Sequence, residues 1–240
     1  MHEIILAASV CLVAGAVQGC TGFGSALVAV PILSLFVDVK IAVVVSSLMG
    51  LAINAVLSVQ LRAFLSKERI LPLFAGAVPG AVLGALFLRN VNEAAILALL
   101  GAGLLAYSSY GLFARPLVIR ITPLRSAFVG LLTGAASAAI SAGGPPAVVY
   151  VSLSGLAKDQ VKATLTGFFA MTGSLVVMGH ALGGLTTVHA QTLALFCLPA
   201  TLAGVALGIR AYGRMSQEGY RKALFVLLAA LGVMMLARSF

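Results

Sequence analysis

Long apolar runs that contain no Asp, Glu, Lys or Arg constrain this chain more than any other feature. The runs cover residues 4–37, 41–61, 70–88, 94–114, 126–157, 163–209 and 223–237. A bilayer core of about 30 Å needs about 20 apolar residues for each crossing helix. Of the 240 residues, 61% are hydrophobic and 9% charged, so no segment remains for a soluble catalytic domain. We therefore expect an all-α integral membrane protein.

Two of the runs, 4–37 and 126–157, are too long for one ordinary helix and too short for two full crossings. Residues that disfavour a helix interrupt each of them, at Gln18–Gly24 and Ser141–Pro146. A broken run followed by three ordinary spans occurs twice, which predicts an internal repeat. The predicted repeats are residues 1–117 (broken run 4–37, spans 41–61, 70–88 and 94–114) and 118–240 (broken run 126–157, spans 163–182, 187–209 and 223–238).

The Lys and Arg residues predict how the repeats are oriented. The loop at 62–69 holds three of these cations, whereas its equivalent at 183–189 holds none, and the next pair of loops reverses this difference. By the positive-inside rule, equivalent loops then face opposite sides of the membrane, so the repeats are inverted. This follows if each broken run enters and leaves on one side as a re-entrant hairpin, with both termini outside. Pairs of short crossings in place of the hairpins stay open as an alternative.

Inverted repeats with a broken helix in each half are typical of secondary transporters that bind substrate near the membrane midplane. The free N–H groups and the positive dipole end of a half-helix attract anions. Asn54 adds an amide that needs polar partners inside its span. We therefore predict an anion site between the two breaks. Its predicted residues are Thr21, Gly22, Gly24, Ser25, Asn54, Ser141, Gly143 and Gly144.

Small residues at four-residue spacing occur on the third apolar segment of each predicted repeat, counting the broken run as the first, at 70–88 and 187–209. Such ridges let membrane helices approach closely, so we interpret them as packing surfaces and not as part of a site. They are Gly76, Gly80 and Gly84 in the first repeat, and Ala200, Gly204 and Gly208 in the second.

Other function classes find little support in the sequence. The net charge of +9 comes from cations between the apolar runs, which indicates topology and not nucleic-acid binding. No Asp or Glu lies inside a span, although a cation carrier usually needs one. Cys11, Cys20 and Cys197 lie in apolar stretches and are interpreted as small buried hydrophobes, so neither a metal nor a cofactor is expected. A membrane-embedded enzyme or assembly factor is the alternative, but the rhomboid GxSG and the metalloprotease HExxH patterns are both missing.

Two glycine-rich stretches carry a family resemblance. Residues Gly19–Leu33 resemble the first such motif of the TauE/SafE (sulfite exporter) family, and Gly143–Tyr150 is similar to its second. The resemblance extends over the whole chain in length, duplication and motif placement. It implies a multi-pass protein of the bacterial inner membrane that moves a small anion, such as sulfite, another sulfur oxyanion or an organosulfonate. The implied partners are this anion and the lipid bilayer, whereas direction, coupling ion and homo-oligomerisation stay open.

Overall fold

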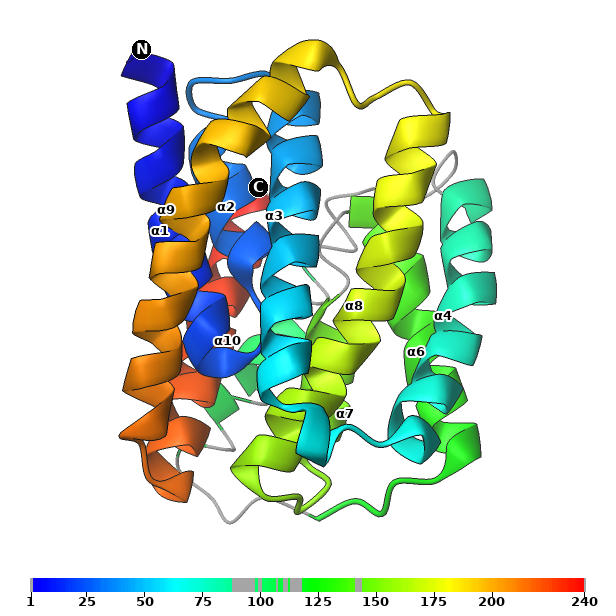
Figure 1. The fold of residues 1–240 in the computed structure, drawn as a ribbon. Helices are drawn as coiled ribbons and strands as arrows, with labels where there is room; N and C mark the ends of the chain where they lie inside the picture. Colours follow the sequence, from blue (N-terminus) through cyan, green and yellow to red (C-terminus); the bar gives the residue numbers. More distant parts are fainter. Residues whose placement is uncertain are drawn as a thin grey trace. The chain divides into compact units, whose positions relative to one another are not determined.

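The computed structural model is helical, as expected, and it describes residues 2–87, 98, 101–106, 108–109, 112, 118–140 and 144–239. Most of the predicted span 94–114 lies outside these residues. The helices are α1 (His2–Thr21), α2 (Ser25–Leu33), α3 (Val39–Gln60), the 3₁₀ turn η1 (Arg62–Phe64), α4 (Lys67–Phe87), α6 (Pro123–Ile140), α7 (Gly144–Ser152), α8 (Lys158–Leu182), α9 (Val188–Gly213) and α10 (Gln217–Arg238) (Figure 1).

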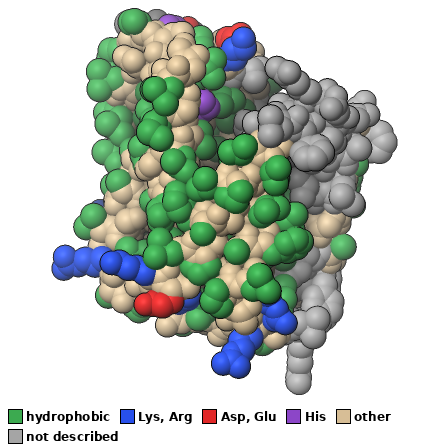
Figure 2. Space-filling model, turned by 90° about the vertical axis from the view of Figure 1, so that its right-hand side faces the viewer, with side chains coloured by type: hydrophobic (Ala, Val, Ile, Leu, Met, Phe, Trp, Pro, Cys, Tyr) green, Lys and Arg blue, Asp and Glu red, His purple; other side chains and the backbone are tan. Residues whose placement is uncertain are grey.

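Within the described ranges, five helices are long and apolar enough to cross a membrane. They are Glu3–Thr21, Lys40–Gln60, Lys158–Leu182, Val188–Gly213 and Gln217–Ala237. Hydrophobic side chains cover much of the described surface in the view of Figure 2, and Lys and Arg lie toward its edges. Leu35, Leu124 and Leu182 are each more than 80% exposed, which suits lipid better than water. The prediction of a multi-pass membrane protein is therefore confirmed.

The helix α8 begins earlier than the sequence predicts. The span was expected from residue 163, with Lys162 in an inner loop, but α8 starts at Lys158 and Lys162 lies in its second turn. Asp159 occupies the first turn, where a carboxylate complements the positive end of the helix dipole. Every residue from 161 to 168 is buried, so tertiary packing extends the helix beyond the apolar run. The expectation that Lys162 is a loop cation is wrong.

The first broken run forms two helices of unequal length. The helix α1 has 20 residues and α2 has nine. At about 1.5 Å per residue, α2 is too short to cross a bilayer. The chain runs back along α1, and the connection at residues 34–38 lies at the same end as the N terminus (Figure 1). In the second broken run α6 ends at Ile140 and α7 begins at Gly144, with residues 141–143 outside the described part.

The chain divides into two compact units, each of which takes helices from both predicted repeats. Unit 1 comprises Met1–Leu65 and Thr166–Met215, and therefore holds α1, α2, α3, most of α8 and α9. Unit 2 comprises Ser66–Leu165 and Ser216–Phe240, and holds α4, α6, α7, the start of α8 and α10.

Glycine ridges bring two pairs of parallel helices into backbone contact. In unit 1, a Cβ at Gly204 of α9 would lie 2.0 Å from the carbonyl oxygen of Leu12 in α1. In unit 2, a Cβ at Gly76 of α4 would lie 1.8 Å from the carbonyl oxygen of Ala127 in α6. Gly208 and Gly80, one turn further on, repeat these contacts, so these four glycines are packing residues as expected. Gly84 also lies in α4, but its side-chain surroundings lie outside what the structure describes.

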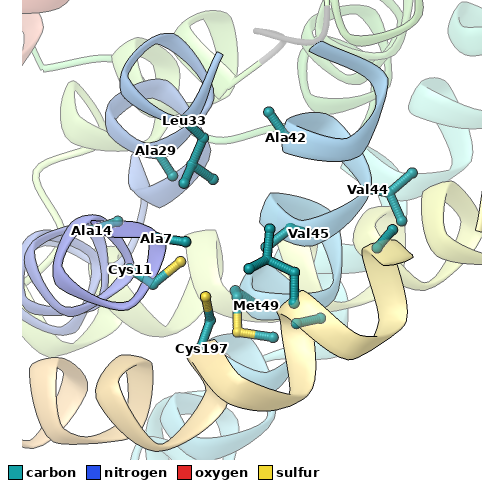
Figure 3. Packing of buried hydrophobic residues seen from close by; sticks show 13 residues of the cluster. Ala7, Cys11, Ala14, Ala29, Leu33, Ala42, Val44, Val45, Met49 and Cys197 are labelled. Atoms are coloured by element: carbon teal, nitrogen blue, oxygen red, sulfur yellow. The ribbon is translucent and has the colours of Figure 1, made fainter. Parts of the chain in front are cut away.

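Small buried side chains form the core of unit 1, where α1, α2, α3 and α9 meet (Figure 3). The thiols of Cys11 and Cys197 point toward one another inside this cluster, beside Met49, and both residues are buried as the sequence predicts. Alanines fill most of the remaining positions of α1 and α9. The cluster is Ala7, Cys11, Ala14, Ala29, Leu33, Ala42, Val44, Val45, Met49, Ala190, Leu193, Ala194 and Cys197.

We expect Gly204→Ala to lower the free energy of unfolding by about 1–3 kcal/mol, because the new methyl group overlaps the α1 backbone. Thermal unfolding in detergent measures this loss. Gly179→Ala is the matched control, since a Cβ at this helical glycine of α8 meets nothing within 4 Å. Equal stability of the two variants would show that the close contact of α1 with α9 is not stabilising.

Candidate functional site

The break between α1 and α2 is a tight turn built on two glycines. Gly22 has φ 88° and Gly24 has φ 94°, a left-handed conformation that side chains with a Cβ rarely adopt. The N–H of Gly22 donates to the carbonyl oxygen of Gln18 at 2.7 Å, which closes the end of α1. Phe23 lies between the glycines with its side chain buried and anchors the turn in the core.

Thr21 stabilises the shape of this turn. Its hydroxyl lies 2.8 Å from the carbonyl oxygens of Val17 and Phe23, one of which accepts its proton. The hydroxyl of this predicted site residue therefore lies within hydrogen-bond distance of the backbone of α1 and of the backbone of the turn. Its contribution in this structure is to hold the start of α2 in place.

A buried polar cluster links the break to α3. The side-chain amide of Gln18 donates to Oδ1 of Asn54 at 2.8 Å, and the hydroxyl of Ser25 donates to Oε1 of Gln18. Gln18, Ser25 and Asn54 are only 3%, 5% and 4% exposed. Buried amides need such partners, so α1, α2 and α3 are tied together at this point. The structure thus brings together the predicted residues Thr21, Gly22, Gly24, Ser25 and Asn54.

One face of α3 continues this cluster away from Asn54. Ser46, Gly50 and Asn54 lie at four-residue intervals and therefore on one side of the helix. A Cβ at Gly50 would lie 3.9 Å from Oγ of Ser25, so this face packs against the start of α2. Ser46 is 3% exposed, and its hydroxyl has no hydrogen-bond partner in the part of the chain that the structure describes. A buried hydroxyl in this state can bind a ligand or water.

The start of α2 supplies further donors. Its N-cap is Gly24, which provides no side-chain cap, and the first N–H groups of a helix have no acceptor within the helix. The helix dipole also gives this end a positive potential. The side chains of Gln18, Ser25, Ser46 and Asn54 are neutral and carry no negative charge that would repel an anion. Their amide and hydroxyl donors, like the N–H groups of α2, therefore favour an anionic or oxygen-rich ligand.

The second break is described only in part. Gly144 begins α7 and is half-buried, and Pro145 and Pro146 occupy the first turn, where proline is well tolerated. The predicted site residues Ser141 and Gly143 lie outside the described residues. That the two breaks face each other stays a prediction.

The site predicted from the sequence omits three residues of the cluster, namely Gln18, Ser46 and Gly50. Gln18 was recognised only as part of the interruption, although an amide three residues before Thr21 in an apolar run needs a buried partner. The four-residue spacing of Ser46, Gly50 and Asn54 was also visible in the sequence.

We expect Gln18→Leu and Asn54→Leu each to destabilise the protein by about 1–3 kcal/mol, because each leaves a buried amide without its partner. The double variant should lose clearly less than the sum of the two single losses. Thermal unfolding of the four proteins completes this cycle. Additive losses would mean that the two amides do not depend on each other.

A family model described as Sulfite exporter TauE/SafE matches residues 7–235, nearly the whole chain. No curated protein and no solved structure matches the chain.

Proposed function

The chain belongs to the TauE/SafE sulfite exporter family, a family of membrane transporters and not of enzymes, and we propose on this premise that it binds its anion at the α1–α2 break. The proposal depends chiefly on one observation. The uncapped start of α2 lies beside the buried Gln18–Asn54 pair and against the α3 face that carries Ser46, whose hydroxyl has no partner among the residues that the structure describes. In this family context, the alternative of a membrane-embedded enzyme is set aside.

The substrate class we propose is a sulfur oxyanion or an organosulfonate, with sulfite as the simplest example. Such anions carry several oxygens that accept hydrogen bonds at once. The N–H groups of α2, the amides and the hydroxyls would replace part of the hydration shell. Because none of these groups is a fixed cation, binding is weak enough for release on the other side of the bacterial inner membrane.

We also propose that the chain consists of inverted repeats. The parallel pairs α1 with α9 and α4 with α6 support this idea, because Gly204 and Gly208 in one pair make the same contacts as Gly76 and Gly80 in the other. In this scheme α1 corresponds to α6 and α9 to α4.

The charges of each unit support a defined topology. In unit 1 the helices α3 and α9 finish on one side, together with Arg62, Arg210 and Arg214. The connections at 34–38 and 183–187 lie on the opposite side of this unit (Figure 1). In unit 2 the helices α4, α6, α8 and α10 all begin at one end, and Lys158 N–H donates to Gln217 across it at 2.8 Å. We propose that these cation-rich ends face the cytoplasm.

Labelling of single cysteines in a background without native cysteines tests this topology. Arg62→Cys should react with a membrane-impermeant maleimide only after the inner face is exposed, whereas Gly184→Cys should react in intact cells. Reaction of both positions from the same face would contradict the inverted arrangement.

We expect Gly24→Val to reduce the flux of labelled sulfite into proteoliposomes at least about tenfold, because the β-branched side chain shifts the start of α2 and removes donors from the anion. Sulfite-dependent thermal stabilisation should disappear in the same variant. Gly184→Val is the matched control. It has the same left-handed strain, with φ 69°, but lies in the connection between α8 and α9.

Gly144→Val extends this experiment to the second break, where we expect a similar loss. Wild-type flux and stabilisation in both Gly24→Val and Gly144→Val would place the site elsewhere. Equal losses in Gly184→Val would indicate that strain, and not lost anion contacts, causes the effect.

A further inference from the structure

We propose that a groove between the start of α6 and the end of α7 binds an anionic phospholipid, with the phosphate on Arg125 and an acyl chain along Leu124 and Phe128. All of these residues belong to unit 2. Lipid binding here does not depend on the proposed anion site at the α1–α2 break, whose residues belong to unit 1.

The groove forms because the chain just before α6 packs along the end of α7. The N–H of Ile119 donates to the carbonyl oxygen of Leu153 at 2.7 Å, and the N–H of Thr122 donates to the hydroxyl of Tyr150 at 3.3 Å. These bonds fix the walls of an open cavity of about 780 Å³, which is within the size range of sites that hold small molecules. The described lining residues are Ile119, Leu124, Arg125, Phe128, Val129 and Tyr150.

One wall of the groove is apolar and open to the surroundings. Leu124 and Phe128 lie one turn apart on α6 and are 83% and 62% exposed, and the exposed Leu132 continues the stripe by another turn. The helix α4 contacts a different face of α6, at Gly130 and Gly134, and therefore leaves this stripe uncovered. An acyl chain that lies along α6 would cover it.

Arg125 supplies the charge of the groove. It is the one charged side chain among the described lining residues, and it is exposed. One terminal nitrogen of its guanidinium donates to the carbonyl oxygen of Arg120 at 3.4 Å. This long bond uses one of five N–H donors and brings no negative charge. A guanidinium can bind a phosphate through two parallel hydrogen bonds, so a lipid phosphate fits the remaining donors.

The sequence around the groove also favours a negatively charged partner. Residues 94–158 contain no Asp or Glu but four cations, namely Arg115, Arg120, Arg125 and Lys158. The start of α6 lies at the cation-rich end of unit 2, for which we propose a cytoplasmic orientation (Figure 1). The cytoplasmic leaflet holds anionic lipids, and basic pockets on this side of a membrane protein bind their headgroups. The phosphate would then lie at the membrane surface and the acyl chain deeper, along the apolar wall.

A second copy of the chain fits the groove less well than a lipid. In a two-fold symmetric contact each patch meets the same patch, so the arginines at 125 of two copies would approach each other. Like charges repel, and the chain has 15 Lys and Arg but only six Asp and Glu to compensate them. A phospholipid brings both the apolar chain and the negative charge.

The test uses the full-length protein in detergent, with phosphatidylglycerol as the anionic probe and phosphatidylethanolamine as the zwitterionic one. Phosphatidylglycerol should raise the melting temperature until the site is saturated, and phosphatidylethanolamine should do so much less. We expect the half-maximal concentration of phosphatidylglycerol to rise about fivefold or more in Arg125→Gln, because one surface cation is lost. It should rise about threefold or more in Phe128→Ala, because apolar contact is lost. Arg125→Lys should keep most of the binding.

Two matched controls separate the groove from the general surface. Arg62→Gln removes an exposed cation of η1, and Phe196→Ala removes a phenylalanine of α9 that is 54% exposed. Neither residue lines the groove, so both variants should keep the wild-type half-maximal concentration. Increases equal to those of Arg125→Gln and Phe128→Ala would overturn the inference, as would equal stabilisation of the wild-type protein by the two lipids.

Further outcomes exclude the other occupants. Equal stabilisation by inorganic phosphate would show that the site takes a free anion, and a wild-type dimer in light scattering that Arg125→Gln and Phe128→Ala dissociate would show a contact between copies. Either result would overturn the inference. If Phe128→Ala does not fold, Arg125→Gln decides alone, since this exposed substitution leaves the core intact and wild-type binding in it would contradict the lipid site. No arm uses sulfite, so a failure of the proposed transport function leaves the result unaffected.

Discussion

Hydrocarbon cannot hydrogen-bond to a peptide group, and the architecture of this protein depends on that constraint. A helix may stop inside the membrane only where protein, water in a cavity or a bound ligand satisfies the exposed N–H and C=O groups. At the α1–α2 break the hydroxyl of Thr21 and the N–H of Gly22 satisfy the end of α1 locally. The start of α2 receives no such cap, and it is the place where the polar side chains of α1 and α3 gather. The turn that needs hydrogen-bond partners is therefore also the turn at which we propose the anion site.

Close packing of small residues supports this arrangement, because there is no hydrophobic effect between helices within lipid. In α1, Gly15 packs against the backbone of Thr201 in α9, and Gly19 packs against the backbone of Val205. Alanine and cysteine side chains fill the adjacent core. The helix α1, which carries Gln18 and Thr21, is thereby held along much of its length. Gln18 and Thr21 are thus positioned by a helix that is packed closely against its neighbour.

Much of the fold could be predicted from the sequence, because lipid imposes length and composition on every span. The charge-free runs gave the approximate bounds of α3, α9 and α10, and the glycines at 22 and 24 gave the first break. The sequence pattern misplaces Lys162, because a charge normally marks the end of a span, whereas here the packing of residues 161–168 buries a lysine that belongs to α8.

The candidate site was found only in part from the sequence, for a related reason. Thr21, Gly22, Gly24 and Ser25 are adjacent along the chain, so their proximity was visible without a structure. The pairing of Gln18 with Asn54 joins different helices. It depends on helix rotation, which weakly amphipathic membrane spans do not encode clearly. The division into units that mix both predicted repeats was hidden as well, since α1 packs on α9 and not on a neighbour in sequence.

The pairing of α1 with α9 has a consequence for biosynthesis. The glycine face of α1 meets its partner only after residues 22–187 have been made, because α9 begins at Val188. At a translation rate of about 5–20 residues per second, that delay lasts roughly 10–30 s. During this time the first helix must stay in the membrane without the partner helix for its glycine face. The partners α4 and α6, which are much nearer in sequence, emerge within a far shorter interval. Unit 2 can thus begin to assemble while the insertion machinery or lipid still covers the face of α1 that completes unit 1.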